Sequence, residues 1–196
     1  MSAVEIPIFP LNSVLFPGSP LPLRIFEPRY TDMISHCMKT NTGFGVCLIR
    51  EGNETGKAAD FHEVGTLARI ADFNMQRDGI LGVVVHGETR FRVLNFDIAK
   101  DQLITAEVEY FDNEPKVTVP EEFQELIQLV ETSIVNNKAC KNEKISFDSD
   151  ASLLGFRLAE ILPLRLSQKQ YFLQLNEPLL RLERIDDVMS QLNLEH

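Results

Sequence analysis

Residues Ile6–Tyr30 read IPIFPLNSVLFPGSPLPLRIFEPRY, and this stretch decides how the chain can fold. Six of the ten prolines lie in it, interleaved with isoleucine, leucine, valine and phenylalanine. Proline fixes φ and donates no backbone hydrogen bond, which excludes a helix and the middle strand of a regular sheet. The stretch is also too apolar for a solvated linker. We therefore predict short extended pieces joined by turns at Asn12-Ser13 and Pro17-Gly18, with apolar side chains in a core, and a helix beginning at Pro28.

The residues up to about 112 alternate between apolar strand patterns and turn signals. Leu103–Phe111 places apolar side chains at every second position, which is typical of a half-buried strand. Ile80–Val85 is nearly all apolar, and we interpret His86-Gly87-Glu88 as a turn that leads into Thr89–Asp97. The first half therefore predicts six or seven short strands and one helix, closed into a small barrel because closure removes exposed strand edges.

The hydrophobic period changes after residue 112. Asp112–Pro120 has no apolar run, and we interpret it as a linker. Beyond it, apolar residues recur at helical spacing over residues 121–136, 151–162, 167–175 and 178–192. We predict an α+β protein with a barrel subdomain over residues 1–113, a bundle of about four helices over residues 114–193, and a possible tag remnant at residues 194–196.

Three motifs of the first half resemble the N-terminal, substrate-binding domain of the ATP-dependent Lon proteases. They are the opening FPLNSVLFPGSPLPLRIFEPRY, the segment Val64–Ile70, and VHGETRFRV at Val85–Val93, which is similar to a hairpin of that family. The resemblance covers essentially the whole chain. It implies a PUA-like barrel followed by a helical bundle, and a recognition module that contacts unfolded or tagged proteins. We expect neither the ATPase module nor the protease module of Lon proteases in this chain.

The charge balance and the cysteines restrict the classes of function. The net charge is −10 at pH 7; residues 1–111 hold 10 Lys/Arg against 14 Asp/Glu, and residues 112–196 hold 9 against 15. Neither half therefore attracts nucleic-acid phosphates or anionic membranes in bulk. The odd number of cysteines (Cys37, Cys47 and Cys140) favours a reducing compartment. With no signal peptide or membrane span in the sequence, we expect a cytoplasmic protein that binds neither nucleic acid nor membrane.

The motifs that resemble catalytic or metal-binding patterns each lack an essential residue. Gly52–Ala58 is similar to a phosphate-binding loop, but it is one residue short between its glycines and ends in alanine instead of Ser or Thr. His62-Glu63 begins like the helix of a zinc protease, but Thr66 occupies the position of the second histidine. We therefore predict no catalytic, cofactor-binding or metal-ligating residues, and a protein that is not an enzyme.

Three functions stay open on the sequence alone. The preferred hypothesis is a non-catalytic protein-binding module whose ligand is an unfolded or flexible protein segment, or a partner protein. The alternatives are an RNA-binding protein that uses the PUA-like barrel and a small-molecule enzyme of unknown type. For the preferred function the candidate binding surface comprises Phe16, Pro17, Leu21 and Leu23. Phe16 is favoured because it precedes the Pro17-Gly18 turn, and turns lie at the protein surface.

Overall fold

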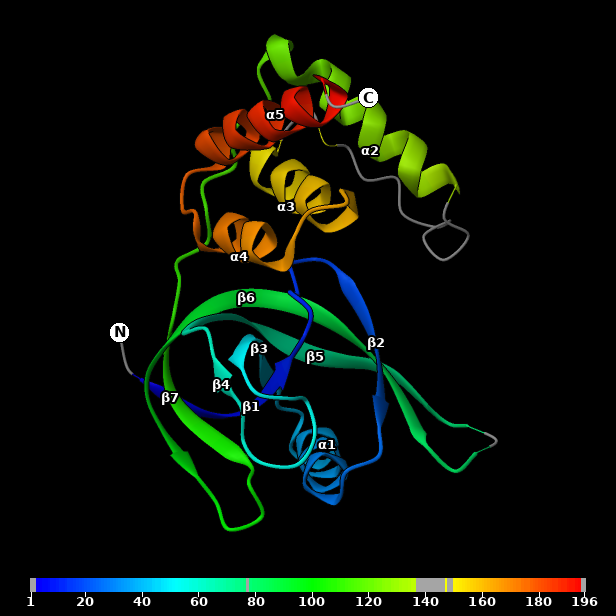
Figure 1. Cartoon of the computed structure of the whole chain (residues 1–196), viewed down its shortest axis with the longest axis vertical. Coiled ribbons are helices and arrows are strands. Elements are labelled where there is room, and N and C mark those ends of the chain that lie inside the picture. Colours follow the sequence, from blue (N-terminus) through cyan, green and yellow to red (C-terminus); the bar gives the residue numbers. More distant parts are fainter. Residues whose placement is uncertain (1–2, 77, 137–146, 148–149, 195–196) are drawn as a thin grey trace. The chain divides into compact units, whose positions relative to one another are not determined.

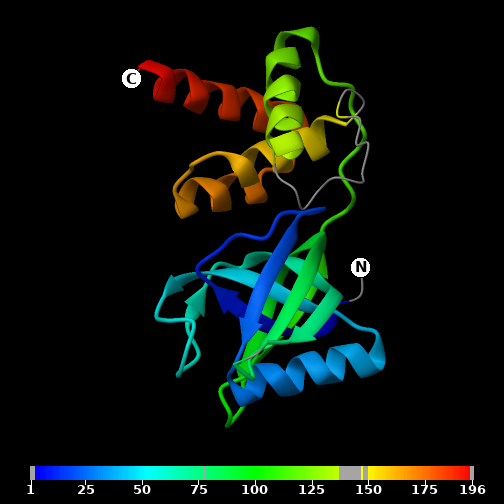
Figure 2. The ribbon, with the colours of Figure 1, turned by 90° about the vertical axis from the view of Figure 1, so that its right-hand side faces the viewer.

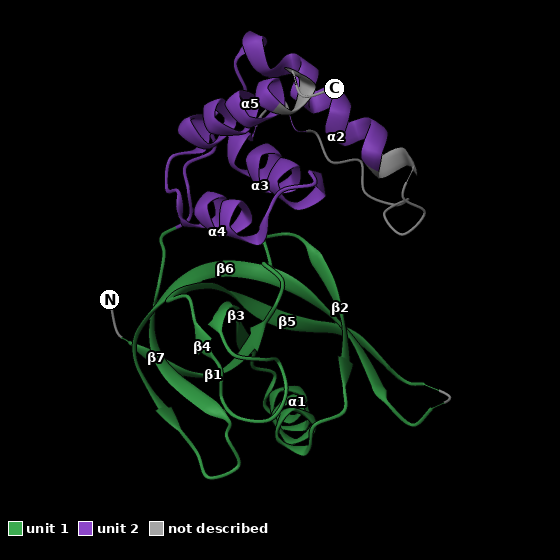
Figure 3. Cartoon of the chain, in the orientation of Figure 1, with its two compact units in different colours: residues 1–112 green, residues 113–196 purple. Residues whose placement is uncertain are grey.

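The computed structural model describes residues 3–76, 78–136, 147 and 150–194 (Figure 1). The chain divides into two units, residues 1–112 and residues 113–196, which are coloured separately in Figure 3. Every described strand lies in the first unit, and the regular elements described in the second unit are helices. The predicted α+β class, with strands before residue 112 and helices after residue 120, is confirmed. The predicted subdomain limits, residues 1–113 and residues 114–193, stay predictions.

Strands of the first unit form a closed ring. β1 pairs with β7, β7 with β6, β6 with β5, β5 with β3, and β3 returns to β1 through a parallel pairing. β2 pairs with β6 outside this ring, and β4 pairs with β3. Closure hides the hydrogen-bonding edges of the ring strands, as predicted. The strands are β1 (Val4–Leu11), β2 (Pro20–Ile25), β3 (Phe44–Glu51), β4 (Asp60–Phe61), β5 (Val64–Met75), β6 (Leu81–Ile98) and β7 (Ile104–Tyr110).

β1 takes part in the ring although it carries two prolines. Its first half, Val4–Ile8, pairs with β7, and its second half, Ile8–Leu11, pairs with β3. Because Ile8 alone is paired on both sides in this register, Pro7 and Pro10 each have one neighbouring strand to accommodate. β1 thus lies in the middle of the sheet, but not as a regular strand with two full ladders, which its prolines exclude.

β6 runs without a break from Leu81 to Ile98, so the turn predicted at His86-Gly87-Glu88 is wrong. Gly87 is needed for another reason, because a Cβ at this position would collide with the carbonyl oxygen of Phe16. Hydrogen bonds tie the two segments together: the N–H of Gly18 donates to the Gly87 carbonyl (2.8 Å), and the N–H of Gly87 donates to the Ser19 carbonyl (3.0 Å). The glycine therefore marks the close approach of another backbone and not a turn.

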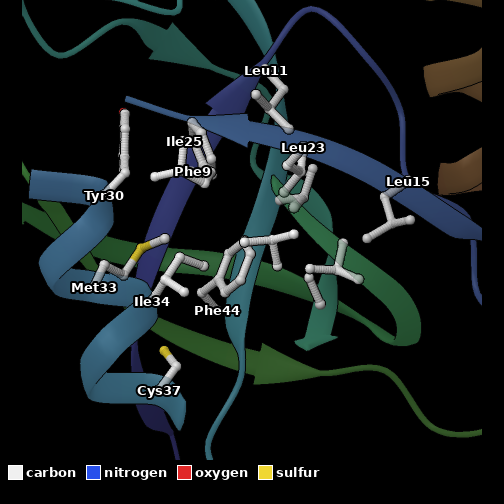
Figure 4. Packing of buried hydrophobic residues seen from close by; sticks show 14 residues of the cluster. Phe9, Leu11, Leu15, Leu23, Ile25, Tyr30, Met33, Ile34, Cys37 and Phe44 are labelled. Carbon is white, nitrogen blue, oxygen red and sulfur yellow. The ribbon is translucent and has the colours of Figure 1, made fainter. Parts of the chain in front are cut away.

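α1 (Pro28–Thr40) packs on the barrel with one apolar face (Figure 2). Pro28 lies in its first turn, as predicted, and Asn41 ends the helix in the left-handed conformation, with φ of 53°. Figure 4 shows the helix side chains directed toward Phe9 of β1 and Phe44 of β3. The buried apolar side chains of this helix face are Tyr30, Met33, Ile34 and Cys37.

A second core cluster surrounds Phe91 on β6. The ring of Phe91 is fully buried and lies against two glycines, Gly45 on β3 and Gly65 on β5. A Cβ at Gly45 would lie 2.5 Å from the Cζ of Phe91, and a Cβ at Gly65 would lie 2.8 Å from the same atom. The two glycines therefore provide the room for a large aromatic ring inside a small barrel.

Gly65→Ala is expected to lower the free energy of unfolding by about 1–3 kcal/mol, the usual cost of overpacking a core. The added methyl group would meet the ring of Phe91, the Sγ of Cys47 (2.6 Å) and the carbonyl oxygen of Val46. Urea unfolding followed by circular dichroism measures the change. In the Gly65→Ala background, Phe91→Leu should recover part of the loss. A single variant as stable as the wild type would show that Gly65 does not make room for the ring.

The second unit contains four described α-helices, at the positions that the periodicity predicts. α3 packs on α2, α4 and α5 and is buried over most of its length. Asp150 caps the first turn of α3 by accepting a hydrogen bond from the N–H of Leu153 (3.1 Å). Cys140 and residues 195–196 of the possible tag remnant lie outside the described residues. The helices are α2 (Gln124–Asn136), which follows the short 3-10 helix η1 (Glu121–Phe123), α3 (Ala151–Ile161), α4 (Leu166–Gln174) and α5 (Pro178–Leu194).

A buried arginine joins several parts of the second unit. Arg181 on α5 is fully buried and forms an ion pair with Glu114, whose side chain is 7% exposed. The guanidinium of Arg181 also donates to two carbonyl oxygens at the C-terminal end of α4. They belong to Phe172, in the last turn of the helix (3.1 Å), and to Leu175, which directly follows the helix (2.5 Å). Besides the two hydrogen bonds from Arg181, Glu114 accepts one from the hydroxyl of Ser152 on α3 (2.5 Å). The segment predicted as a linker is therefore anchored to the helices through Glu114.

Candidate functional site

A pocket of about 300 Å³ opens in the first unit beside β2. One wall is the segment Leu21–Glu27, which comprises most of β2 and the two residues after it. Phe9 of β1 and Tyr30 of α1 contribute aromatic rings, and Glu54 and Thr55 come from the loop between β3 and β4. Figure 4 shows the part of this arrangement that belongs to the core. The pocket therefore brings together segments that are far apart in the sequence.

β2 is an edge strand, since among the described strands it pairs with β6 alone. Pro20 and Pro22 lie opposite His86 and Val84 in this pairing. Because a proline nitrogen has no hydrogen to donate, we place the two proline nitrogens on the edge that faces away from β6. The free edge of β2 offers carbonyl oxygens as acceptors, but it lacks the backbone N–H donors of Pro20 and Pro22. Another strand could therefore not form a full set of hydrogen bonds with it. A ligand beside β2 must therefore be held mainly through its side chains.

Tyr30 combines an aromatic ring with a hydroxyl group in the pocket wall. The residue is 5% exposed, its ring stacks on Phe9 with the two centroids 3.9 Å apart, and the guanidinium of Arg29 lies 4.5 Å from its centre. Burial raises the pKa of Tyr30 to about 12, and the nearby Arg29 opposes this shift in part. The hydroxyl is therefore protonated at neutral pH and can donate a hydrogen bond to a ligand.

Some charged groups around the pocket have an ion-pair partner and one has none among the described residues. Arg24 lies 2.6 Å from a carboxylate oxygen of Asp78, and Arg29 lies 3.1 Å from a carboxylate oxygen of Glu27. Glu54 accepts a backbone hydrogen bond of 2.6 Å, but it forms no ion pair with any residue that the structure describes. The pocket therefore carries one carboxylate without a partner cation in the described part of the chain.

The structure brings two of the four predicted surface residues to this pocket. Leu21 and Leu23 line it, whereas Pro17 is half-buried in its turn and does not. The prediction that Phe16 lies on the surface is wrong, because its side chain is fully buried. The turn exposes Gly18, while the residue before the turn contributes its carbonyl to the closing hydrogen bond and turns its side chain inward. That Leu21 and Leu23 bind a protein stays a prediction.

Phe26 and Glu54 line the pocket but are not among the residues predicted from the sequence. Phe26 lines the pocket and is 60% exposed. The alternation along β2 indicates this position, because Leu23 and Ile25 are buried and the residues between and after them face outward. No local pattern indicates Glu54, because its position depends on a contact with the backbone of Asn12, 42 residues earlier.

The motifs that resemble catalytic patterns fall in places that do not suit them. Gly52–Ala58 lies between β3 and β4, whereas a phosphate-binding loop leads from a strand into the N-terminus of a helix. Within residues 3–76, 78–136, 147 and 150–194, no group of three or more His, Cys, Asp or Glu could hold a metal ion. In the same part of the chain, we find no helix with the length and apolar character needed to cross a bilayer.

A closed barrel in the first unit and four α-helices among the described residues of the second define an α+β protein, with a pocket beside β2 of the barrel. The family model of the ATP-dependent protease La (LON) substrate-binding domain matches residues 5–191. The chain therefore belongs to the LON substrate-binding domain family, and the resemblance seen in the sequence motifs is confirmed.

Solved structures agree with this assignment. The chain is similar to a Lon N-terminal domain protein from Xanthomonas campestris, with 34% identity and a TM-score of 0.78 over 93% of this chain and 96% of that chain. It also shares the fold of the N-terminal domain of the Lon protease from Mycobacterium avium complex. That likeness has 16% identity and a TM-score of 0.65 over 95% of this chain and 98% of that chain.

Curated relatives show which part of a Lon protease the chain matches. It is 26% identical to Lon protease 1 of Bdellovibrio bacteriovorus over 97% of this chain, and 26% identical to Lon protease 2 of Herpetosiphon aurantiacus over 100% of this chain. Each match covers 25% of the relative, so the chain spans about a quarter of the length of these proteins. The matching family model describes the substrate-binding domain and not the catalytic domains.

Proposed function

We propose that this chain is a non-catalytic protein-binding module that captures an unfolded or flexible segment of another protein in the pocket beside β2. The observation that carries the proposal is the exposed ring of Phe26 at a pocket of a substrate-binding family domain. Large aromatic side chains are enriched at binding hot spots, because they bury much apolar area at little cost in side-chain entropy.

The size and lining of the pocket favour side chains as the ligand. A volume of about 300 Å³ lies at the lower limit of the pockets that enclose small molecules. Leucine, isoleucine and phenylalanine side chains form much of the lining, among them Leu21, Leu23 and Ile25. An unfolded segment exposes apolar side chains that a folded protein buries. The pocket therefore suits such a segment better than it suits a polar cofactor.

The RNA-binding alternative has little support from the arginines of the barrel. Arg24, Arg29 and Arg69 each form an ion pair with a carboxylate, Arg90 is buried, and the exposed Arg92 lies over the ring of Phe111. Binding to a nucleic-acid backbone requires cations that face solvent and displace counterions from phosphates. We therefore keep a protein segment as the proposed partner and include no nucleic acid.

The small-molecule-enzyme alternative gains no support from the hydroxyl of Tyr30 in the pocket wall. A general acid or base works best when its pKa lies near the working pH. Burial moves the pKa of Tyr30 to about 12, which is further from neutrality than its ordinary value. This shift suits a fixed hydrogen-bond donor and not a group that exchanges protons.

Phe26→Ala is expected to weaken the binding of an unfolded protein about tenfold, which corresponds to about 1.4 kcal/mol and is typical of a hot-spot residue. The side chain is 60% exposed. Its loss should therefore change the free energy of unfolding by less than about 0.5 kcal/mol. Fluorescence anisotropy with labelled lactalbumin that has been reduced and carboxymethylated measures the affinity, and thermal melting measures the stability.

Phe73→Ala is the matched control for this experiment. Phe73 is also an exposed phenylalanine (54%), but it lies on β5 and does not line the pocket. The Phe73→Ala variant should keep the wild-type affinity for the unfolded protein and the wild-type melting temperature. Equal affinities of the wild type and Phe26→Ala would remove Phe26 from the proposed site. A wild-type protein that binds no unfolded protein would contradict the proposed function.

A further inference from the structure

We infer that the pocket selects segments in which an apolar side chain has a lysine or arginine as its direct neighbour. The inference rests on the proposed function and adds the charge of the ligand to it. The apolar side chain enters the pocket beside β2, and the cationic group reaches the carboxylate of Glu54, which lines the same pocket.

Glu54 is the carboxylate that such a cation would compensate. Glu27, which also lines the pocket, already has Arg29 as its partner, and Arg24 has Asp78. Within the described residues, Glu54 has no partner cation. Its charge reaches into the pocket, since it is one of the groups that raise the pKa of Tyr30, although burial is the main cause. A cationic side chain near Tyr30 would therefore meet a negative potential.

The carboxylate of Glu54 is held in place without any ligand. Its Oε1 accepts a hydrogen bond from the N–H of Asn12 (2.6 Å), which leaves its second oxygen for a cation. The same loop is fixed a short distance further on, where the N–H of Gly56 donates to the Oε2 of Glu27 (3.2 Å). Gly56 has a φ of 86°, a conformation that glycine adopts readily. A charge that is ordered in advance loses little entropy when a ligand binds.

The edge of β2 makes side-chain recognition the main source of selectivity. Pro20 and Pro22 remove two donors from that edge, so a bound segment cannot gain a full ladder of backbone hydrogen bonds. The net charge of −10 adds a long-range preference, because a cationic segment is attracted before it makes contact. The shape and the charge of the pocket therefore both select a ligand by its side chains.

Fluorescent peptides that differ at a single position test the inference. They share an unstructured Gly-Ser backbone with one leucine, and the residue after the leucine is Lys, Gln or Glu. The wild-type protein is expected to bind the Lys peptide about threefold to fivefold more tightly than the Gln peptide, as for a partly exposed ion pair. The Glu peptide should bind more weakly than both. Raising the salt concentration to about 0.5 M should reduce the difference between the peptides.

Glu54→Gln tests whether the preference comes from this carboxylate. The amide oxygen of glutamine can still accept the hydrogen bond from Asn12, so the loop keeps its anchor. The variant is expected to lose the preference and to bind the Lys and Gln peptides with equal affinity. Glu51→Gln is the matched control, because Glu51 is exposed at the end of β3 and does not line the pocket. It should retain the preference for lysine.

The outcomes separate this inference from the proposed function. If the wild type binds the Lys and Gln peptides equally, the inference is overturned and the protein-binding function stands. If the preference for lysine persists in Glu54→Gln, the assignment to Glu54 is overturned. If neither the peptides nor an unfolded protein binds, the proposed function itself is contradicted.

Discussion

Glu114→Ala is expected to destabilise the second unit by about 3–5 kcal/mol, because it leaves the buried guanidinium of Arg181 without its counter-charge. Arg181 is fully buried and Glu114 is 7% exposed, so water cannot easily replace the lost partner. The hydroxyl of Ser152 loses its acceptor in the same variant. Calorimetry measures the effect, and a loss of this size should lower the Tm by roughly 6–20 °C.

Glu183→Ala is the matched control, because Glu183 is an exposed glutamate on α5. Glu183→Ala should lower the free energy of unfolding by less than about 0.5 kcal/mol. Replacing both partners, Glu114→Met with Arg181→Leu, should cost much less than Glu114→Ala alone, since an apolar pair needs no counter-charge. A Glu114→Ala protein with the Tm of the wild type would show that the ion pair does not stabilise the second unit.

Phe16→Ala is expected to cost about 3–5 kcal/mol of unfolding free energy, the usual loss when a buried aromatic ring is removed. The side chain of Phe16 is fully buried. Phe9→Ala should cost a similar amount, because Phe9 is 6% exposed and stacks on the ring of Tyr30. Each change leaves a cavity that the neighbouring side chains fill only in part. Thermal and urea unfolding of the purified single variants measure the losses.

The exposed Phe26 is the internal comparison for these two phenylalanines. All three belong to the proline-rich stretch that begins the chain, so they share composition and neighbourhood in the sequence. Phe26→Ala should unfold nearly as the wild type does. If Phe16→Ala melted at the same temperature as Phe26→Ala, the burial of Phe16 would contribute nothing to stability, and Phe16 would again be a candidate for the binding surface.

The fold class follows from local effects that a sequence displays directly. The prolines of residues 6–30 exclude helices by sterics, and the change of hydrophobic period near residue 112 separates strands from helices. The closure of the barrel depends on distant pairings such as Ile8 with Gly45, which no local pattern specifies. Gly87 shows the same limit: the sequence indicates a special backbone position, but a turn and the close approach of another backbone segment both call for glycine.

The candidate site was predictable only in part, from the apolar side chains of β2. Leu21 and Leu23 line the pocket because the whole segment Leu21–Glu27 forms one of its walls. Phe16 was misplaced because the rule that turns lie at the surface concerns the backbone and does not decide where the preceding side chain points. Glu54 enters the pocket through a contact between two loops, and only the folded chain brings these loops together.

A ribosome releases β1 long before β7, yet the two strands pair residue for residue, Val4 with Val108 and Ile8 with Ile104. The ring therefore cannot close until nearly all of the first unit has left the exit tunnel. Until that moment the nascent chain presents open strand edges and apolar side chains that the finished barrel hides. Until its ring closes, the first unit therefore exposes the same kinds of group that any unfolded protein exposes.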